Sequence, residues 1–261
     1  MMDKSKIEKY GDELYEALVN RKAVAPLTDR EADITIEDAY QIQQRMIQRR
    51  LDTGETIIGK KIGVTSKVVM DMLKVDQPDF GMMTSGMVFN EGEAIDTSTM
   101  IAPRAEAEVA FVLKSDLMGP GVTAADVLRA TDFVVPCFEI VDSRIQDWKI
   151  KIQDTVADNA SCGVLTLGGR RKSPRDIDLA LAGMVLEKNG EVISTSTGAA
   201  VQGSPVNAVA WLANTLGRLG IGLKAGEVIL SGSQSPLVPV KAGDSLVCSV
   251  GGLGSTSVRF I

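Results

Sequence analysis

The chain has 261 residues, 44% of them hydrophobic and 24% charged, which excludes disordered and fibrous classes, and no apolar run reaches the roughly 20 residues of a membrane-spanning helix. Lys and Arg number 28 and Asp and Glu 34, so the net charge of −6 argues against sequence-independent binding of nucleic acid phosphates. The absence of histidine excludes a Ser-His-Asp triad, histidine-ligated zinc and an imidazole general base.

The first fifty-odd residues are predicted to be mostly helical. Apolar residues recur at helical spacing over residues 6–22, although Gly11 weakens the middle of that helix. Thr35 is a predicted N-cap, because acidic residues follow it in the first turn and an apolar face continues over residues 39–51. Two amphipathic helices are therefore expected in this part of the chain.

After Gly54 the pattern changes to short β-rich runs separated by glycine and proline. The clearest runs are residues 105–113, 133–141, 162–167 and 182–187. Asn189-Gly190 follows the last of these runs and precedes a further short one, which is the strongest signal of a β-hairpin in the chain. This part of the sequence is therefore expected to be rich in strands.

Two more helices are expected among these strands. One covers residues 123–129, and the other is capped by Ser204, opened by Pro205 and ended by Gly220. The last forty residues read as closing strands between glycine-rich turns. The sequence thus predicts an α+β fold, with a mostly helical region at residues 1–55 and a β-rich domain at residues 56–261.

Cysteine use and the first residues indicate the cell compartment. Cys137, Cys162 and Cys248 lie far apart and form no CxxC pair, so neither a disulfide framework nor a structural zinc site is expected. The first eleven residues are rich in Lys and Glu and show no signal-peptide pattern. We therefore expect a cytoplasmic protein.

Two glutamates are expected on one face of a strand. Side chains two residues apart share a side of a strand, so Glu106 and Glu108 should lie together. Two adjacent carboxylates repel each other unless one is protonated or a cation lies between them, and hard oxygen ligands suit Mg²⁺ or Mn²⁺. The alternative is an exposed polar face on an edge strand. The neighbouring alanines and the apolar run that follows favour a buried site.

A third carboxylate, Glu139, is the only charge inside the apolar run that begins at Val134. Buried carboxylates are seldom unpaired. Two explanations stay open from the residues alone. Glu139 either completes a metal site with the other two glutamates, or it pairs with an arginine such as Arg104 or Arg144.

Lysine and aspartate provide further candidates for acid-base chemistry. Lys60 and Lys61 are adjacent in a predicted strand, so one should point inward and the other outward. An inward lysine near a metal would bind a substrate carboxylate or move a proton, whereas strand-end lysines would ordinarily contact solvent. Asp79 lies in a turn-like stretch, where it is either a cap or a proton acceptor.

A polar segment and two pairs of glycines are further candidates for binding roles. The polar segment 154–163 is expected to be a loop, either lining a cleft or lying on the surface. The glycine pairs at 168–169 and 251–252 match neither a P-loop nor a GxGxxG turn, so no nucleotide cofactor is expected.

Four motifs occur in order along the chain: GKKIGVT at 59–65, QPDFG at 77–81, PRAEAE at 103–108 and VADNAS at 156–161. With these motifs the chain resembles the 2-hydroxypenta-2,4-dienoate hydratases, also called 2-oxopent-4-enoate hydratases, of aromatic meta-cleavage catabolism. The resemblance covers nearly the whole length. It implies the fumarylacetoacetate hydrolase-like fold, with a helical N-terminal part and a β-rich C-terminal domain around a divalent-metal site.

The resemblance also implies roles for individual residues. It makes three carboxylates the ligands of Mg²⁺ or Mn²⁺: Glu106, Glu108 and Glu139. It places three further residues in the active site: Lys61, Asp79 and Ser161. The implied reaction adds water to 2-hydroxypenta-2,4-dienoate and yields 4-hydroxy-2-oxopentanoate, with Lys61 or Asp79 relaying protons.

Three other functions compete with this one. The 4-oxalocrotonate decarboxylases share the fold and the metal site, but the PDF sequence at 78–80 and Arg104 before the glutamate pair resemble the hydratase pattern. A carbon-carbon bond hydrolase of the same fold usually employs a histidine, which this chain lacks. A non-catalytic metal-binding partner subunit could lose the three active-site residues, all of which are present here.

The resemblance finally implies the partners of the protein. It implies a small 2-hydroxydienoate substrate, a homo-oligomer, and a complex with the 4-oxalocrotonate decarboxylase that supplies the unstable substrate. Neither nucleic acid nor a membrane is expected as a partner.

Overall fold

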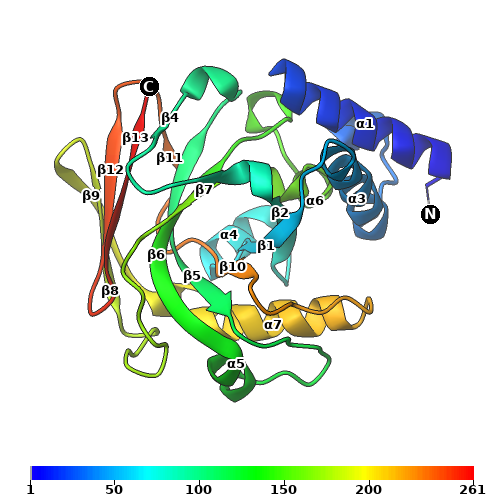
Figure 1. Ribbon diagram of the computed structural model, residues 1–261. Coiled ribbons are helices and arrows are strands. Elements are labelled where there is room, and N and C mark those ends of the chain that lie inside the picture. The colour runs from blue at the N-terminus through cyan, green and yellow to red at the C-terminus, as the bar shows by residue number, and fades with distance from the viewer. Residues whose placement is uncertain (1) are drawn as a thin grey trace.

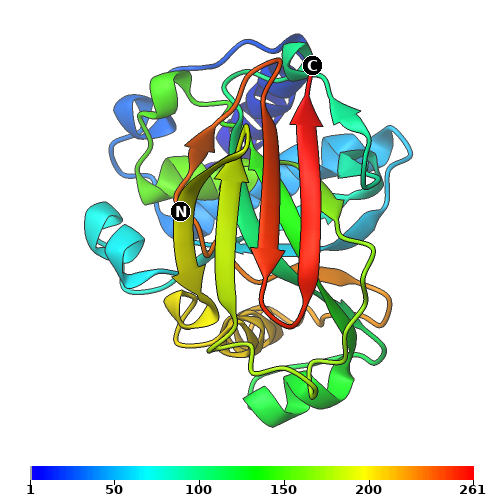
Figure 2. The same cartoon turned by 90° about the vertical axis from the view of Figure 1, so that its left-hand side faces the viewer.

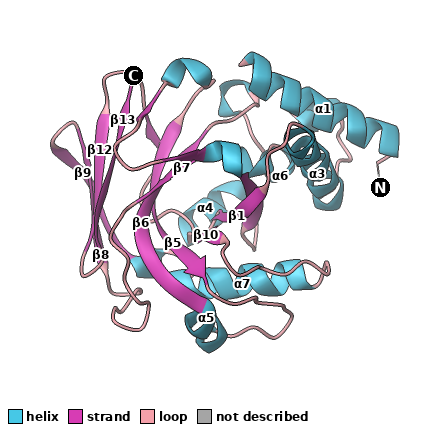
Figure 3. Ribbon diagram, viewed as in Figure 1, coloured by secondary structure: helices cyan, strands magenta, loops and turns pink. Residues whose placement is uncertain are grey.

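A computed structural model of the protein describes residues 2–261, apart from the side chains of Val68, Met72 and Leu73. Helices gather at the N-terminal end, and two β-sheets follow them across the molecule (Figure 1). Figure 3 shows the same division by secondary structure, with strands concentrated away from the N-terminus. No described helix is both long enough and apolar enough to cross a lipid bilayer.

Three helices precede the first strand: α1 (Lys4–Asn20), α2 (Leu27–Arg30) and α3 (Ile36–Asp52). The predicted N-cap of α3 is present, because Asp38 N donates a hydrogen bond to Thr35 Oγ1 and Thr35 N donates one to the Asp38 carboxylate. α1 and α3 share a buried apolar face that includes Leu14 and Ile42. Gly11 permits their close approach, because a Cβ there would lie 2.9 Å from Ile42 O.

The larger sheet has eight strands: β1 (Ile57–Gly63), β2 (Asp79–Thr84), β3 (Val88–Phe89), β5 (Arg104–Leu113), β6 (Thr131–Val141), β7 (Cys162–Leu167), β10 (Val228–Leu230) and β11 (Val238–Pro239). Their order is β2-β1-β10-β5-β6-β7-β3, and β11 also pairs with β5. β1 runs parallel to β10, whereas β5 runs antiparallel to both β10 and β6. β5 therefore lies inside the sheet.

The smaller sheet has five strands: β4 (Ala94–Ile95), β8 (Gly183–Lys188), β9 (Glu191–Thr197), β12 (Ser245–Val250) and β13 (Gly254–Phe260). Their order is β4-β13-β12-β8-β9, and Figure 2 shows the sheet face on. The predicted hairpin joins β8 to β9. Asn189 and Gly190 have φ values of 55° and 84°, as a two-residue hairpin turn of type I′ requires.

Short helices complete the chain: α4 (Lys67–Leu73), α5 (Ala124–Ala130), α6 (Ile152–Ala157), and the 3-10 turns η1 (Ser85–Met87), η2 (Thr97–Thr99), η3 (Gln146–Trp148), η4 (Asn159–Ser161) and η5 (Gly198–Ala200). The longer α7 (Pro205–Gly217) begins after Ser204, whose hydroxyl accepts a hydrogen bond from Val206 N, as the sequence predicted. α7 buries residues such as Leu212 in the main core.

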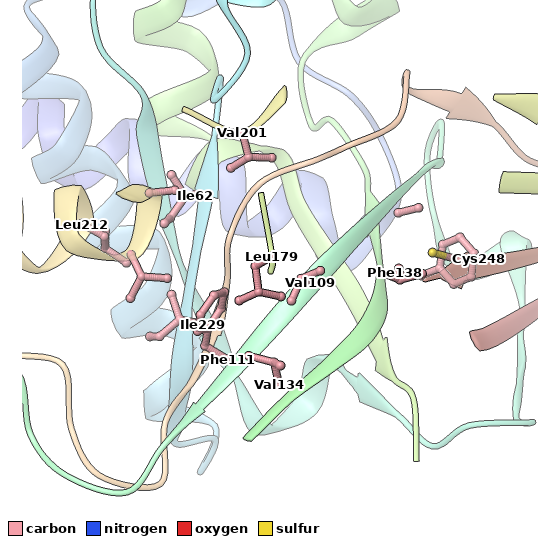
Figure 4. Packing of buried hydrophobic residues seen from close by; sticks show 14 of the residues in the cluster. Ile62, Val109, Phe111, Val134, Phe138, Leu179, Val201, Leu212, Ile229 and Cys248 are labelled. Atoms are coloured by element: carbon pink, nitrogen blue, oxygen red, sulfur yellow. The ribbon is translucent and has the colours of Figure 1, made fainter. Parts of the chain in front are cut away.

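The main core covers one face of the eight-stranded sheet, so a functional site can lie only on the other face. Val109 and Phe111 of β5 pack in this core with Phe138 of β6 and with Cys248 of the smaller sheet. Figure 4 shows Phe111 near Ile229 and Phe138 beside Cys248. Side chains alternate across a strand, so the even-numbered residues of β5 face the other way, toward β1, β2 and α6.

Candidate metal centre and active site

Three glutamates meet on the even-numbered face of β5. Glu106 and Glu139 are directly paired residues of the antiparallel strands β5 and β6, and Glu108 lies two residues along on the same side. One carboxylate oxygen of each lies within 4.8 Å of the others. Glu108 and Glu139 are fully buried and Glu106 is partly buried. Because β5 is an interior strand, the alternative of an exposed edge is wrong.

These carboxylates lack the donors that would satisfy them. Gly232 N donates a hydrogen bond of 2.8 Å to Glu108 Oε2, but Glu108 Oε1 and both oxygens of Glu139 accept none within the described part of the chain. Burial raises the pKa of Glu106 to about 7, and it also raises the pKa of Glu108 and of Glu139. Clustered anionic oxygens without partners are unfavourable in a protein interior. Their hardness and number fit a divalent cation such as Mg²⁺ or Mn²⁺.

Lys61 of β1 lies beside this cluster. Its Nζ is 3.3 Å from Glu139 Oε1 and donates a hydrogen bond of 2.9 Å to Ala160 O. Burial alone would lower the pKa of Lys61, but the negative charge of Glu139 and of nearby carboxylates outweighs burial and raises that pKa. Lys61 is therefore an ammonium ion held against the glutamates.

The arginine partners that the sequence suggested for Glu139 are wrong. Arg144 is fully buried and pairs with Asp158, with its Nε 2.5 Å from Asp158 Oδ1. Arg104 makes no ion pair with Glu139, whose contact is with Lys61. Glu139 thus belongs to the cluster of three glutamates and also forms an ion pair, but its cationic partner is Lys61 and not an arginine.

Lys60 and Lys61 point to opposite sides of β1, as the alternation predicted. Lys60 Nζ lies 2.5 Å from Glu227 Oε1, and the two lysines are only 3% and 2% exposed. The interpretation of solvent-contacting strand-end lysines is therefore wrong for both. Lys61 alone belongs to the glutamate cluster.

Asp79 is the first residue of β2 and lies opposite Gly63 of β1. Asp79 does not cap a helix, because the strand β2 begins at this residue, and its buried Oδ1 has no hydrogen-bond partner among the described residues. Burial raises the pKa of Asp79, and this effect is larger than the lowering of that pKa by the positive charge of Lys61. A carboxyl group that holds its proton more tightly than usual beside an ammonium ion is suited to proton transfer.

Ser161 lies in a turn with an uncommon backbone. The polar segment 154–163, for which the sequence predicts a loop, folds instead as the end of α6, the turn η4 and the start of β7. Asn159, Ala160 and Ser161 have φ values of 54°, 51° and 53°, in the left-handed region that disfavours residues with a Cβ. Ser161 Oγ lies 3.5 Å from Thr155 Oγ1.

The side chain of Asn159 holds this turn against β2. Its Oδ1 accepts a hydrogen bond of 2.8 Å from Met82 N, and its Nδ2 donates one of 2.9 Å to Met82 O. Gly81 leaves room for the contact, because a Cβ there would lie 2.5 Å from Asn159 O. The turn thus presents Ala160 O to Lys61 and Ser161 to the space beyond. Backbone strain of this kind is characteristic of functional sites.

One cavity of about 450 Å³ joins these groups. Four of the predicted site residues line it: Lys61, Asp79, Glu106 and Ser161. Glu108 and Glu139 are fully buried beside Glu106, within the same cluster of carboxylate oxygens. The volume suits a small molecule, and apolar side chains such as Val69, Val141 and Leu237 form another part of its wall.

Several residues that line the cavity were not predicted from the sequence as site residues: Arg104, Trp148, Thr155, Ser233 and Ser235. Arg104 could have been found from the period of two, because it precedes Glu106 by two residues in the same strand. The two serines follow β10, far along the chain from the other groups, and no local pattern marks them.

Residues 60–261 match the family described as "Fumarylacetoacetate (FAA) hydrolase C-terminal". The chain is 57% identical to a 2-hydroxyhexa-2,4-dienoate hydratase of Comamonas testosteroni, over 100% of this chain and 99% of that one. It is 65% identical to a 2-hydroxypent-2,4-dienoate hydratase of Pseudomonas putida, over 84% of this chain and 100% of that one. Among solved structures, the 4-oxalocrotonate decarboxylase from Pseudomonas putida G7, complexed with magnesium and adipate, is 36% identical, with a TM-score of 0.97 over 100% of this chain and 99% of that chain.

Proposed function

Because the chain belongs to the fumarylacetoacetate hydrolase family, and its full-length relatives include dienoate hydratases, we propose that it adds water to 2-hydroxypenta-2,4-dienoate to form 4-hydroxy-2-oxopentanoate. The enzyme is thus a hydro-lyase. The observation that carries this function is the meeting of three clustered glutamates, two of them with buried oxygens that have no hydrogen-bond partner among the described residues, with Lys61 and Asp79 around one small cavity.

The divalent ion is assigned to Glu106, Glu108 and Glu139, whose clustered carboxylate oxygens fit Mg²⁺ or Mn²⁺. Magnesium is the ion named with the decarboxylase of the same fold. Bound there, the ion supplies positive charge that stabilises negative charge on a 2-oxo acid. The ligand assignment is supported by the burial and mutual distances of the three carboxylates.

The reaction requires two proton deliveries to carbon and one addition of hydroxide. The dienol loses the proton of its 2-hydroxyl group and gains one at C5, which gives the conjugated 2-oxo-3-enoate. Water then adds its oxygen at C4, and a proton arrives at C3. The sum is one molecule of water added, so neither an oxidant nor a reductant is needed.

Lys61 and Asp79 are the groups assigned to these proton transfers. Asp79 holds a proton more tightly because it is buried, whereas Lys61 stays an ammonium ion beside the carboxylates. The pair therefore offers two different donors within one cavity. Ser161 lies on the turn with left-handed backbone, lines the same cavity and is assigned to orienting the water that adds at C4.

The choice of hydratase over decarboxylase is supported by identities of 57% and 65% to hydratases, against 36% to the decarboxylase. The decarboxylase stays the second candidate, because its backbone superposes over the whole chain with a TM-score of 0.97. A homo-oligomer, a complex with the decarboxylase that supplies the substrate, a cytoplasmic location and a role in meta-cleavage catabolism complete the proposal, supported by the resemblance in motifs.

Mass spectrometry of the products distinguishes the candidates. Protein loaded with Mg²⁺ or Mn²⁺, and protein stripped of metal, are incubated separately with 2-hydroxypenta-2,4-dienoate and with 4-oxalocrotonate. Metal-dependent gain of one water by the first substrate is the expected result. Loss of CO₂ from the second substrate without hydration of the first would make the protein a decarboxylase, and no turnover of either would indicate a non-catalytic subunit.

A further inference from the structure

Arg104 is a half-buried cation that forms no ion pair with a carboxylate among the described residues. It is the first residue of β5, it shares a face of that strand with Glu106, and it lines the cavity. Within the part of the chain that the structure describes, no carboxylate lies at ion-pair distance from its guanidinium, and its N–H groups donate no hydrogen bond to protein. A guanidinium has five donors, and leaving them unused in a partly buried place is unfavourable.

Trp148 holds this guanidinium in place. The Arg104 Cζ atom lies 4.4 Å from the centroid of the Trp148 ring, a cation-π contact. Trp148 has a φ of 55° and the preceding Asp147 a φ of 57°, so two successive residues with side chains adopt the left-handed conformation. A bulky residue takes that conformation only where its surroundings impose it.

The indole is itself anchored from the end of β6. Trp148 Nε1 donates a hydrogen bond of 3.1 Å to Ala102 O. Ala102 N and Ile101 N donate bonds of 2.7 and 2.9 Å to the buried carboxylate of Asp142. A continuous set of contacts therefore fixes the aromatic ring beneath Arg104. The arrangement holds a free cation at one side of the cavity without neutralising it.

We propose that Arg104 binds the carboxylate of the 2-hydroxydienoate substrate. This deepens the proposed function and rests on it. Two cations line the cavity, and Lys61 is already engaged with Glu139 and with Ala160 O. Arg104 has its donors free, and a guanidinium matches a carboxylate with two parallel hydrogen bonds.

The position of Arg104 also sets the direction of the substrate. Arg104 lies on β5 two residues before Glu106, and both line the cavity, whereas Lys61 and Asp79 line it from β1 and β2. A carboxylate paired with Arg104 places the adjacent C2 oxygen near the glutamates. The diene carbons then extend toward Lys61 and Asp79, the groups assigned to proton transfer.

The first test is a kinetic comparison with a matched control. Arg171 makes the same kind of contact, with its Cζ 4.5 Å from the centroid of Phe133, but it does not line the cavity. We expect Arg104→Met to raise KM for 2-hydroxypenta-2,4-dienoate about 10- to 100-fold with kcat within about threefold, as loss of charge-assisted hydrogen bonds predicts. The KM of Arg104→Lys should lie between those of the wild type and Arg104→Met, and the KM of Arg171→Met should equal that of the wild type. Mn²⁺ affinity should be unchanged in all three variants.

Trp148 gives a second pair of variants. Trp148→Phe keeps an aromatic face under the guanidinium but loses the hydrogen bond from Nε1 to Ala102 O, so it should raise KM less than Trp148→Ala, which should raise KM in the same direction as Arg104→Met. An unchanged KM in folded Arg104→Met would overturn the proposal. An effect confined to the dicarboxylate 4-oxalocrotonate would also overturn it, because Arg104 would then bind the far end of a longer substrate.

Direct binding separates this proposal from the proposed function. Calorimetry with the unreactive probe 2-oxopentanoate measures affinity in Mn²⁺-loaded wild type, Arg104→Met and Arg104→Lys without any turnover. Weaker binding to Arg104→Met supports the role of Arg104 even if the wild type fails to hydrate the dienoate. Equal binding to wild type and Arg104→Met, or no binding to the wild type, contradicts that role even if hydration is observed.

Discussion

Gly63 of β1 faces Asp79 of β2 so closely that a Cβ on Gly63 would lie 2.2 Å from Asp79 Oδ1. That added Cβ would also lie 3.3 Å from Lys61 Nζ. Non-bonded heavy atoms do not approach to 2.2 Å, so any side chain at this position displaces the aspartate. The absent side chain of Gly63 is thus part of what places Asp79 beside Lys61.

Gly63→Ala is expected to lower kcat about 100-fold or more, because the displaced carboxyl group no longer lies where a proton is transferred. The overpacked strand should cost about 1–3 kcal/mol of stability, and Mn²⁺ affinity should be retained. Steady-state kinetics and thermal unfolding measure these effects. Gly183→Ala is the matched control, since the nearest atom to its added Cβ lies at 4.0 Å. Wild-type kcat in Gly63→Ala would remove Asp79 from the mechanism.

Removing one carboxylate from the glutamate cluster should abolish metal binding without destabilising the metal-free protein. In metal-free protein, Glu108→Gln replaces a buried carboxylate by a neutral amide of the same shape, so it should be as stable as the wild type or about 1 kcal/mol more stable. Mn²⁺ should raise the melting temperature of the wild type but not of Glu108→Gln. Calorimetric scans with and without Mn²⁺ test both statements, and equal stabilisation of the two proteins by Mn²⁺ would contradict the ligand assignment.

Metal binding should release protons in a pH-dependent way. Burial raises the pKa of Glu106 to about 7 in the metal-free protein, so this carboxyl group is largely protonated at pH 6 and largely ionised at pH 8. Since a ligand must be deprotonated, affinity should fall by up to about tenfold per unit below pH 7. Titration calorimetry in two buffers of different ionisation enthalpy counts the protons. Glu106→Gln should release fewer at pH 6, and a wild type that releases none there would show that Glu106 is ionised without metal.

The two adjacent lysines provide a paired comparison. Lys61→Met should lower kcat about 100- to 10,000-fold and leave metal affinity equal or higher, because a cation next to Glu139 has been removed. Replacing Lys60 alone would leave Glu227 buried and unpaired, so the control is Lys60→Met with Glu227→Gln. This double variant should keep wild-type kcat. A similar loss of kcat in both proteins would mean that packing around β1, and not the Lys61 ammonium, limits the rate.

Patterns within single strands were sufficient to predict the three glutamates of the candidate site. The period of two places Glu106 and Glu108 on one face, and a lone charge in an apolar run marks Glu139. Their meeting depends on the register of β5 against β6, in which Glu106 pairs with Glu139. Register between strands joined by a long connection is set by the whole core, so the residues alone left the arginine alternative open.

Other misreadings have the same cause, a partner far away in sequence. Lys60 looked solvent-exposed because its partner Glu227 lies 167 residues away. The segment at 154–163 lines the cavity through Thr155 and Ser161, as one of the two alternatives predicted, but it is not a loop, and its Asp158 is buried by pairing with Arg144. Composition cannot show that a charge is already satisfied inside the protein.

The division at residues 1–55 and 56–261 stays a prediction, and the structure links the two sides closely. Tyr40 of α3 stacks on Phe80 of β2, with ring centroids 4.4 Å apart. Gln43 Nε2 donates hydrogen bonds of 2.9 and 3.0 Å to Phe80 O and Val156 O. α3 therefore supports both the strand that carries Asp79 and the helix that leads to Ser161.

The most direct test is the rate of dienoate hydration as a function of Mn²⁺ bound per chain. Protein stripped of metal is titrated with Mn²⁺, bound metal is measured in each sample, and formation of 4-hydroxy-2-oxopentanoate is followed by mass spectrometry. A buried cluster of three carboxylates predicts a rate that rises in proportion to bound Mn²⁺ and saturates near one ion per chain, with no such rise in Glu108→Gln. A full rate in the metal-free wild type, or an unchanged titration in Glu108→Gln, would contradict it.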